Sequence, residues 1–166
     1  MAIRDILLLG NPLLYEVCEP VVRRELEELS PVIEDLHDTM LDFRLRHGTG
    51  RAIAAPQIGV MKRLVVMDID RRIVFLNPAL DMMSGETFDL WDDCMSFPGL
   101  LVKVRRHLRC RLRYKDEQWI DRELTLEGAL SELLQHECDH CDGILAVQRA
   151  LDGKALALVS ERRSAG

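Results

Sequence analysis

Two histidines and a glutamate stand close together near the C-terminal end of the sequence, within the run Gln135-His136-Glu137-Cys138-Asp139-His140. On a helix, residues four apart lie about 40° apart around the axis, so both imidazoles can reach one metal ion from the same face. The glutamate beside the first histidine lies at the rim of that face, where it can handle a proton on metal-bound water. The alternative is an amphipathic helix whose polar residues face water. A hydrolytic metal site is the hypothesis that the rest of the sequence must support.

A catalytic site of this kind usually has three protein ligands and one position open to water, and the two histidines supply only two. Carboxylates, the other cysteines and three further histidines are all candidates for the third ligand on sequence alone, the histidines being His37, His47 and His107. Cys138 and Cys141 form a tempting pair. On a helix, however, they lie about 200° and 140° around the axis from His136, so we expect them to be core or surface thiols.

Two helices are expected to frame this chemistry. Apolar and small residues recur at helical spacing from 127 to about 141, and Gly143 follows as the terminating residue. Earlier in the chain, Ser30 can cap a helix whose first residue is Pro31, with four apolar residues on one face and Gly48 as its end. Those four residues are Ile33, Leu36, Met40 and Phe43.

The middle of the chain is rich in strand signals. We expect strands at 64–67, 73–76, 102–104, 108–114 and 120–126, the second one ended by Asn77-Pro78. Small residues from 48 to 59 indicate either a tightly packed corner or a close approach of backbone to a ligand. We read 91–99 as a connection closed by a Pro-Gly turn and 151–159 as a short helical tail. The predicted fold class is α+β, with antiparallel-rich sheets packed around the C-terminal helix and a second, N-terminal helix.

Composition and charge narrow the class of protein. With 166 residues, 48% hydrophobic and 30% charged, the chain suits one domain spanning 1–166. The net charge of −6 argues against a nucleic-acid surface. The apolar run at 6–9 is too short for a signal peptide or a membrane span. Five cysteines with irregular spacing fit a reducing cytoplasm better than a disulfide framework.

Three blocks of the chain resemble, in the same order, the three signature blocks of the peptide deformylases. The family patterns are Gly-x-Gly-x-Ala-Ala-x-Gln, Glu-Gly-Cys-x-Ser and Gln-His-Glu-x-Asp-His. Here they read Gly50-Arg51-Ala52-Ile53-Ala54-Ala55-Pro56-Gln57, Asp92-Asp93-Cys94-Met95-Ser96 and Gln135-His136-Glu137-Cys138-Asp139-His140. Together with smaller matching features, the resemblance covers roughly residues 6 to 145.

The resemblance implies that Cys94 is the third metal ligand, bound as thiolate beside His136 and His140. It implies one divalent metal ion per chain, Fe(II) natively, with Zn(II) or Ni(II) able to occupy the same site. Water on the metal, assisted by Glu137, would attack the formyl carbon of an N-formyl peptide and release formate, and Glu137 would pass the proton to the departing amine. The family's oxyanion donors correspond to the side-chain amide of Gln57 and the backbone N–H of Met95.

The chain departs from the family's pattern mainly on the substrate side. Arg51 replaces an aliphatic residue, Ala52 replaces a glycine, and Asp93 replaces the glycine before Cys94. Asp92 is a shortened form of the family's glutamate. We expect it to pair with Arg106, with a surface ion pair as the alternative.

Two further acidic residues lie on the helix that carries the histidines. Asp139 is expected to orient the metal ligands, a helix-surface salt bridge being the other reading. Glu132 lies one turn before His136, where the family usually has an aliphatic residue that lines the methionine pocket. A buried carboxylate needs a cation, so we expect Glu132 to meet Arg51 across this pocket, narrowing it or making it polar.

The sequence therefore predicts a metal-dependent hydrolase that removes the N-formyl group from N-formylmethionyl peptides, in N-terminal processing during protein biosynthesis. Two alternatives stay open: a deformylase-like amidohydrolase for another N-formyl or N-acyl substrate, and a non-catalytic metal-binding paralogue. The expected partner is an N-formylated peptide or nascent-chain N-terminus, without nucleic acid or membrane. The sequence does not decide between a monomer and a homodimer.

Overall fold

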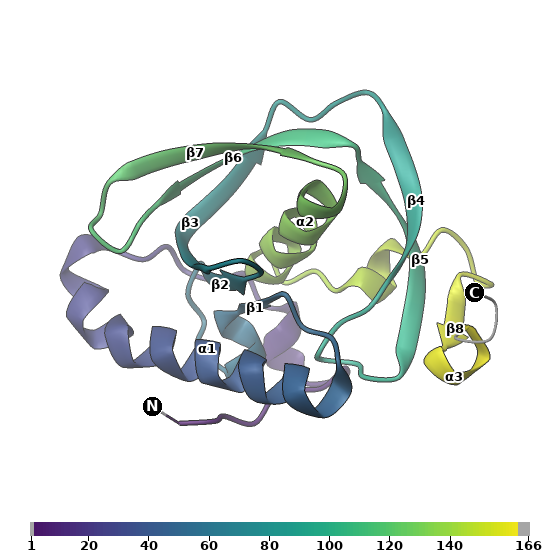
Figure 1. The fold of residues 1–166 in the computed structure, drawn as a ribbon, viewed down its shortest axis with the longest axis horizontal. Coiled ribbons are helices and arrows are strands. Elements are labelled where there is room, and N and C mark those ends of the chain that lie inside the picture. The colour runs from purple at the N-terminus through teal and green to yellow at the C-terminus, as the bar shows by residue number, and fades with distance from the viewer. Residues whose placement is uncertain (1, 163–166) are drawn as a thin grey trace.

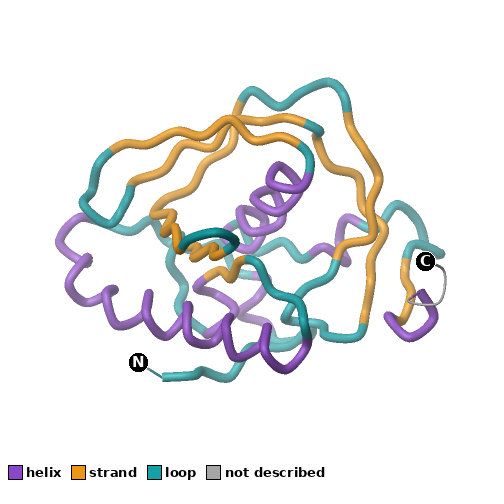
Figure 2. The backbone as a smooth tube through the Cα atoms, viewed as in Figure 1, coloured by secondary structure: helices purple, strands orange, loops and turns teal. Residues whose placement is uncertain are grey.

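A computed structural model describes residues 2–162, arranged as two antiparallel sheets around one central helix (Figures 1 and 2). The larger sheet has the strand order β1-β2-β3-β6-β7, and the smaller has the order β4-β5-β8. The helices are α1 (Leu26–His47), α2 (Ala129–Cys141) and α3 (Val159–Arg162). The strands are β1 (Ala52–Ala54), β2 (Leu64–Asp68), β3 (Arg72–Asp81), β4 (Thr87–Asp92), β5 (Leu100–His107), β6 (Arg109–Lys115), β7 (Asp121–Glu127) and β8 (Leu156–Leu158). The predicted α+β class is confirmed.

Helix α2 lies in the middle of the molecule, with both sheets curving around it (Figure 1). Every residue from 131 to 141 is buried, although the sequence of this helix is polar. One side packs Leu134, Cys138 and Cys141 into the apolar cluster formed with the larger sheet. The opposite side carries the histidines and Glu137. The helix is therefore held by its apolar side and presents its polar side to an interior site.

Helix α1 runs along the outside of the larger sheet and closes a second apolar cluster. Its buried face contains the predicted Ile33, Leu36, Met40 and Phe43, and it ends at Gly48, whose positive φ of 74° suits a residue without a Cβ. The predicted start at Pro31 was wrong, because the helix begins at Leu26. Packing of Leu26 and Leu29 against the cluster extends the helix by about one turn and outweighs the unfavourable proline.

Strand β3 continues through Asn77-Pro78, where we predicted its end. The pairing with β6 shifts register between Leu76 and Ala79, and Asn77 takes a φ of 52°. The Asn77 side chain accepts a hydrogen bond from the Val21 N–H and donates one to the Val21 carbonyl. The register shift thus accommodates Asn77-Pro78 within β3, and the strand continues past it.

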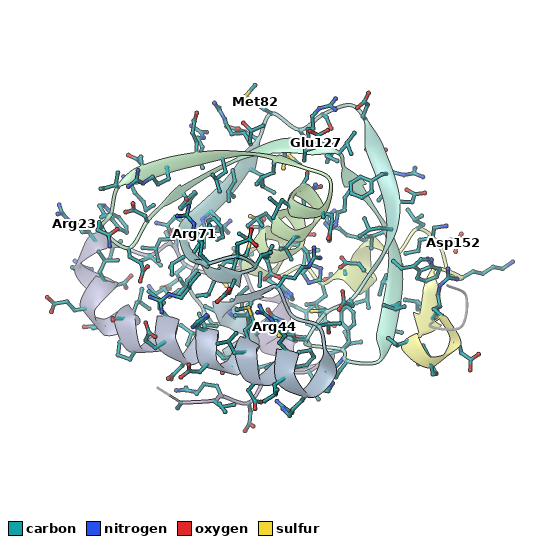
Figure 3. All side chains as sticks on the ribbon, in the orientation of Figure 1. Arg23, Arg44, Arg71, Met82, Glu127 and Asp152 are labelled. Atoms are coloured by element: carbon teal, nitrogen blue, oxygen red, sulfur yellow. The ribbon has the colours of Figure 1, made fainter. Side chains whose placement is uncertain are left out.

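Three short strands were missed by the sequence analysis. Strand β4 includes Trp91 and Asp92, which we had assigned to a connection, and it pairs along its length with β5. Strand β1 lies within the stretch of small residues, and each residue of the strand is buried. The predicted helical tail was wrong for residues 156–158, which form β8 and pair with the start of β5. Side chains on the outer loops, such as Met82 and Asp152, point away from the body (Figure 3).

None of the helices within residues 2–162 combines the length and the apolar composition that a membrane-spanning segment needs.

Candidate active site

Three potential metal ligands converge where α2 faces the connection between β4 and β5. Cys94 lies on that connection, and His136 and His140 lie on successive turns of α2. Nε2 of His140 is 3.2 Å from Nε2 of His136 and 3.4 Å from Sγ of Cys94. Ligand atoms bound tetrahedrally at about 2.0–2.3 Å from an ion are roughly 3.3–3.7 Å apart. The two distances from His140 therefore match the spacing around a small divalent cation, and all three atoms lie within 4.8 Å of one another.

The other histidines considered as ligands are engaged elsewhere. Nε2 of His37 lies 2.6 Å from a carboxylate oxygen of Asp68, and Nδ1 of His107 lies 2.8 Å from the carbonyl of Ser84. His47 stacks on the ring of Phe43. Within residues 2–162, Cys94, His136 and His140 form the one cluster of histidine, cysteine or acidic side chains with metal-ligand spacing.

Cys138 and Cys141 face away from the ligand cluster, as predicted from the helical angle. Both are buried in the apolar cluster against the larger sheet. Burial raises the pKa of the Cys141 thiol to about 12 and that of Cys138 well above its usual range. These thiols are core residues and stay protonated near neutral pH.

A buried chain of ionic contacts fixes the orientation of His136. Nδ1 of His136 donates to Asp92 at 2.8 Å, and Nη2 of Arg106 lies 3.4 Å from the same carboxylate oxygen. Burial alone would raise the pKa of Asp92, but the charges of His136 and Arg106 lower it. The ionised carboxylate thus holds Nδ1–H and directs Nε2 toward Cys94. The predicted Asp92–Arg106 pair is confirmed, even though the aspartate is one methylene shorter than a glutamate.

Asp139, which also lies on α2, extends this chain of ionic contacts. It accepts a hydrogen bond from Nη1 of Arg106 at 2.6 Å, and Arg149 donates two more at 2.6 and 2.7 Å. Of the two readings of Asp139, a surface pair and a contact that supports the ligands, the structure favours the second through Arg106. Arg149 follows α2 in the 3-10 helix Ala146–Arg149 and was missed, since nothing in its spacing marks it.

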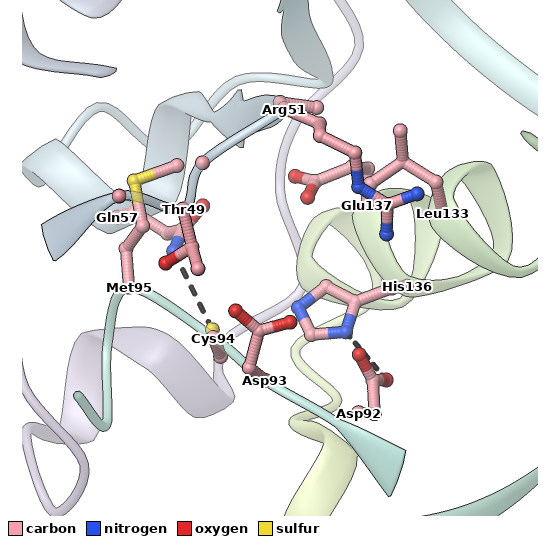
Figure 4. Close-up of a pocket in the computed structure, with 13 residues that line it drawn as sticks. Thr49, Arg51, Gln57, Asp92, Asp93, Cys94, Met95, Leu133, His136 and Glu137 are labelled. Atoms are coloured by element: carbon pink, nitrogen blue, oxygen red, sulfur yellow. Dashed lines mark hydrogen bonds and ion pairs between the residues drawn. The ribbon is translucent and has the colours of Figure 1, made fainter. Parts of the chain in front are cut away.

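The ligand cluster opens into a cavity of about 250 Å³. Figure 4 shows that its wall combines the loop before β1, the connection after β4 and one side of α2. Predicted residues that line it are Arg51, Ala52, Gln57, Asp92, Asp93, Cys94, Met95, His136 and Glu137. Thr49 and Leu133 line it too and were missed. Leu133 was within reach of sequence reasoning, because it lies three residues before His136 on the same side of the helix.

Glu137 lines this cavity from α2. It is 3% exposed, and its Oε2 has no hydrogen-bond partner among the described residues. Burial raises the pKa of this carboxyl to about 7, and the neighbouring charge of His136 acts in the opposite direction. A carboxyl with a pKa near neutrality can both take up and release a proton at physiological pH.

Gln57 reaches the same space from the 3-10 helix Ala55–Ile58. Its Oε1 accepts from the backbone N–H of Ala54 at 2.9 Å, so its Nε2 is directed to Ser96 Oγ at 3.1 Å and Cys94 Sγ at 3.6 Å. The fixed amide therefore presents a donor to the region of the ligand cluster. Ser96 was not singled out from the sequence for this contact.

Arg51 and Glu132 meet, as predicted. Nη2 of Arg51 donates to Oε1 of Glu132 at 2.6 Å, and the Glu132 side chain is 6% exposed. Burial raises the pKa of Glu132, and the charge of Arg51 partly counteracts this shift. Arg51 lines the cavity, whereas Glu132 lies behind it and does not belong to the lining. Their role in substrate binding stays a prediction.

The comparisons with known proteins agree on one family. The family model described as polypeptide deformylase matches residues 3–155. A peptide deformylase of Leptospira biflexa is 34% identical over 180 residues, covering 100% of this chain and 98% of the relative. The structure of a peptide deformylase from Legionella pneumophila has a TM-score of 0.83 and 38% identity, covering 92% of this chain and 88% of that one. The Thermotoga maritima peptide deformylase also has a TM-score of 0.83, with 31% identity and coverage of 92% and 100%.

Proposed function

We propose which residues carry the reaction of this chain, which belongs to the polypeptide deformylase family. The chain is a metal-dependent hydrolase that removes the formyl group from N-formylmethionyl peptides. We assign Cys94, His136 and His140 as the metal ligands and Glu137 as the proton carrier. The observation that carries this assignment is the buried carboxylate of Glu137, whose Oε2 lacks a hydrogen-bond partner within residues 2–162, beside three converging ligand atoms.

Cys94, His136 and His140 would hold a divalent cation, which when bound would polarise a carbonyl and lower the pKa of water so that it can lose a proton near neutral pH. Glu137 takes the proton from the attacking water, because its pKa of about 7 suits it as a base. It then delivers that proton to the amine nitrogen as the C–N bond breaks. The products are formate and the free amine, so the atoms of water and amide are balanced.

The developing negative charge on the formyl oxygen needs donors already in position. Gln57 Nε2 is held by the bond that its Oε1 makes to Ala54, and we propose that it donates to this oxygen together with the backbone N–H of Met95. A preorganised donor of this kind is worth about 10²–10³ in kcat. Gln57→Leu should therefore lower kcat more than it raises KM.

We propose Fe(II) as the native metal, following the resemblance; the donor set also suits zinc and nickel. Metal analysis of protein purified without oxygen tests this point. We propose a cytoplasmic location, because all five cysteines are free thiols and not paired in disulfides, as expected in a reducing compartment. An N-formylated nascent chain is the proposed partner.

Glu137→Gln tests the assignment. The amide keeps the size of the side chain but cannot carry the proton, so hydrolysis of formyl-Met-Ala should fall by at least about 10²-fold while the metal content stays at one ion per chain. Retained turnover would remove Glu137 from the mechanism. No turnover in either protein would favour a non-catalytic metal-binding paralogue, and turnover confined to another acyl group would favour a different amidohydrolase.

A further inference from the structure

The Arg51–Glu132 ion pair lies at the site where the substrate must enter, and the reaction itself has no use for it. Arg51 reaches the catalytic cavity from the loop before β1, and its side chain extends toward α2 (Figure 4). Glu132 holds it there from the interior side at 2.6 Å. The pair therefore forms a charged end wall only one helical turn from the ligand cluster.

Two cavities meet at this cluster, and an N-formyl peptide has two branches to place in them. The catalytic cavity of about 250 Å³ and a second cavity of about 490 Å³ share Thr49, Asp93 and Cys94. The carbon next to the formylated nitrogen carries a side chain and the continuing peptide. The smaller cavity, closed by Arg51, suits the side chain, and the larger one suits the peptide.

Arg51 has more donors than Glu132 uses. Among the described residues its side chain makes one hydrogen bond, through Nη2 to Glu132, and a guanidinium carries five N–H donors. The side chain is 42% exposed, so water reaches the remaining donors. A substrate side chain that enters the cavity displaces this water. If the substrate side chain ends in an apolar group, the displaced water leaves the Arg51 N–H donors without a partner. If it ends in a hydrogen-bond acceptor, that acceptor replaces the water.

We infer that Arg51, held by Glu132, makes the side-chain cavity selective for a first residue that ends in a hydrogen-bond acceptor over an apolar one of equal length. This inference rests on the proposed function, because it assumes that the formyl group is placed at Cys94, His136 and His140. Arg51 is the specificity residue, and Glu132 is the residue that positions it.

Side chains of equal length test the selectivity. The substrates are formyl-Gln-Ala, formyl-norleucyl-Ala and formyl-Met-Ala, which differ at the end of the first side chain. A lost hydrogen bond to a charged donor corresponds to about 10–100-fold, so kcat/KM for formyl-Gln-Ala should exceed that for formyl-norleucyl-Ala by at least about 10-fold. The effect should lie mainly in KM, because the contact is the same before and during the reaction.

The variant Arg51→Leu/Glu132→Leu replaces the pair with apolar side chains and should reverse the order, so that norleucine and methionine are preferred. The control is Arg72→Leu/Glu34→Leu, which removes another arginine–glutamate pair at the same 2.6 Å distance but outside both cavities, and it should leave the order unchanged. If the double leucine variant does not fold, Glu132→Gln takes its place. By removing the competing charge, it should raise the preference for formyl-Glu-Ala over formyl-Gln-Ala.

A wild-type preference for norleucine, or an order that the Arg51 variants leave unchanged, overturns the inference. Failure of the proposed function gives a different result, namely no hydrolysis by wild type or equal hydrolysis by Glu137→Gln. If Glu137→Gln hydrolyses the dipeptides as fast as wild type, the kcat/KM ratios still rank the side chains. If wild type hydrolyses none of them, dissociation constants of the same dipeptides for wild type, measured by calorimetry, rank them instead. Tighter binding of the glutamine compound then supports the inference, and equal or weaker binding overturns it.

Discussion

Replacing Arg106 with leucine removes the residue that joins Asp92 to Asp139 behind the metal ligands. Arg106 is 3% exposed and contacts Asp139 at 2.6 Å and Asp92 at 3.4 Å. Breaking a buried ion pair costs about 3–5 kcal/mol when the partner is left uncompensated. Here Asp139 keeps two bonds from Arg149, and Asp92 keeps His136. We therefore expect the lower end, about 3 kcal/mol, or a fall in Tm of roughly 6–12 °C.

Urea unfolding of the metal-free and metal-loaded forms measures this loss, and a competing chelator measures metal affinity. Because Arg106 acts on His136 through Asp92, metal affinity should fall by about 10-fold, at the lower end of the range for residues that support ligands. Arg105→Leu is the control, since Arg105 immediately precedes Arg106 on β5 and pairs with Asp89 at the surface. It should stay within about 0.5 kcal/mol of the parent. An equally small effect of Arg106→Leu would refute the reasoning.

Two further predictions concern a glycine and the thiols. Gly143→Ala should lower the free energy of unfolding by about 3 kcal/mol or more, because φ of Gly143 is +71° and an added Cβ would lie 2.5 Å from the carbonyl oxygen of Tyr15. The control is Gly48→Ala, where φ is similar but a Cβ would meet no atom within 4 Å. Measured by urea unfolding, this control should lose about 1–2 kcal/mol. Equal losses would remove the steric part of the argument. In native metal-loaded protein no thiol should react rapidly with a disulfide reagent near pH 8, and chelation should expose Cys94 alone, since Cys141 has a pKa of about 12. Rapid reaction of Cys141 would show that its side of α2 opens.

The site was more predictable from the sequence than the sheets that hold it. The spacing of His136 and His140 fixes their common direction on any helix, so the pair followed from helical geometry alone. Cys94 could not be reached in this way. It lies 42 residues earlier, and only the resemblance, followed by the fold, brings it to the histidines.

The errors in the fold have local physical causes. Asn77-Pro78 is a turn signal in isolation, but bonds from Asn77 to Val21 keep it within β3. Strand β4 was missed because its alternation of polar and apolar residues is short, running only from Thr87 to Leu90 before Trp91 and Asp92 interrupt it. Hydrogen bonding to β5 along the whole of β4 stabilises this strand, although its own sequence pattern is weak. Arg51 and Glu132 were paired correctly because a buried carboxylate needs a cation, which is a requirement of charge and not of fold.

Cys94 and His136 lie at the two ends of a long segment of the chain, so a metal ion that binds both closes a loop and reduces the entropy of the unfolded chain. A metal ion that joins Cys94 to His136 ties together residues that are 42 positions apart (136 − 94), a segment that contains β5, β6 and β7. In the loop-closure model, a permanent cross-link over such a segment removes about 4 kcal/mol of chain entropy from the unfolded state. The ion would thus act as a reversible cross-link between α2 and the connection that follows β4, and its release would lower the free energy of unfolding by up to this amount.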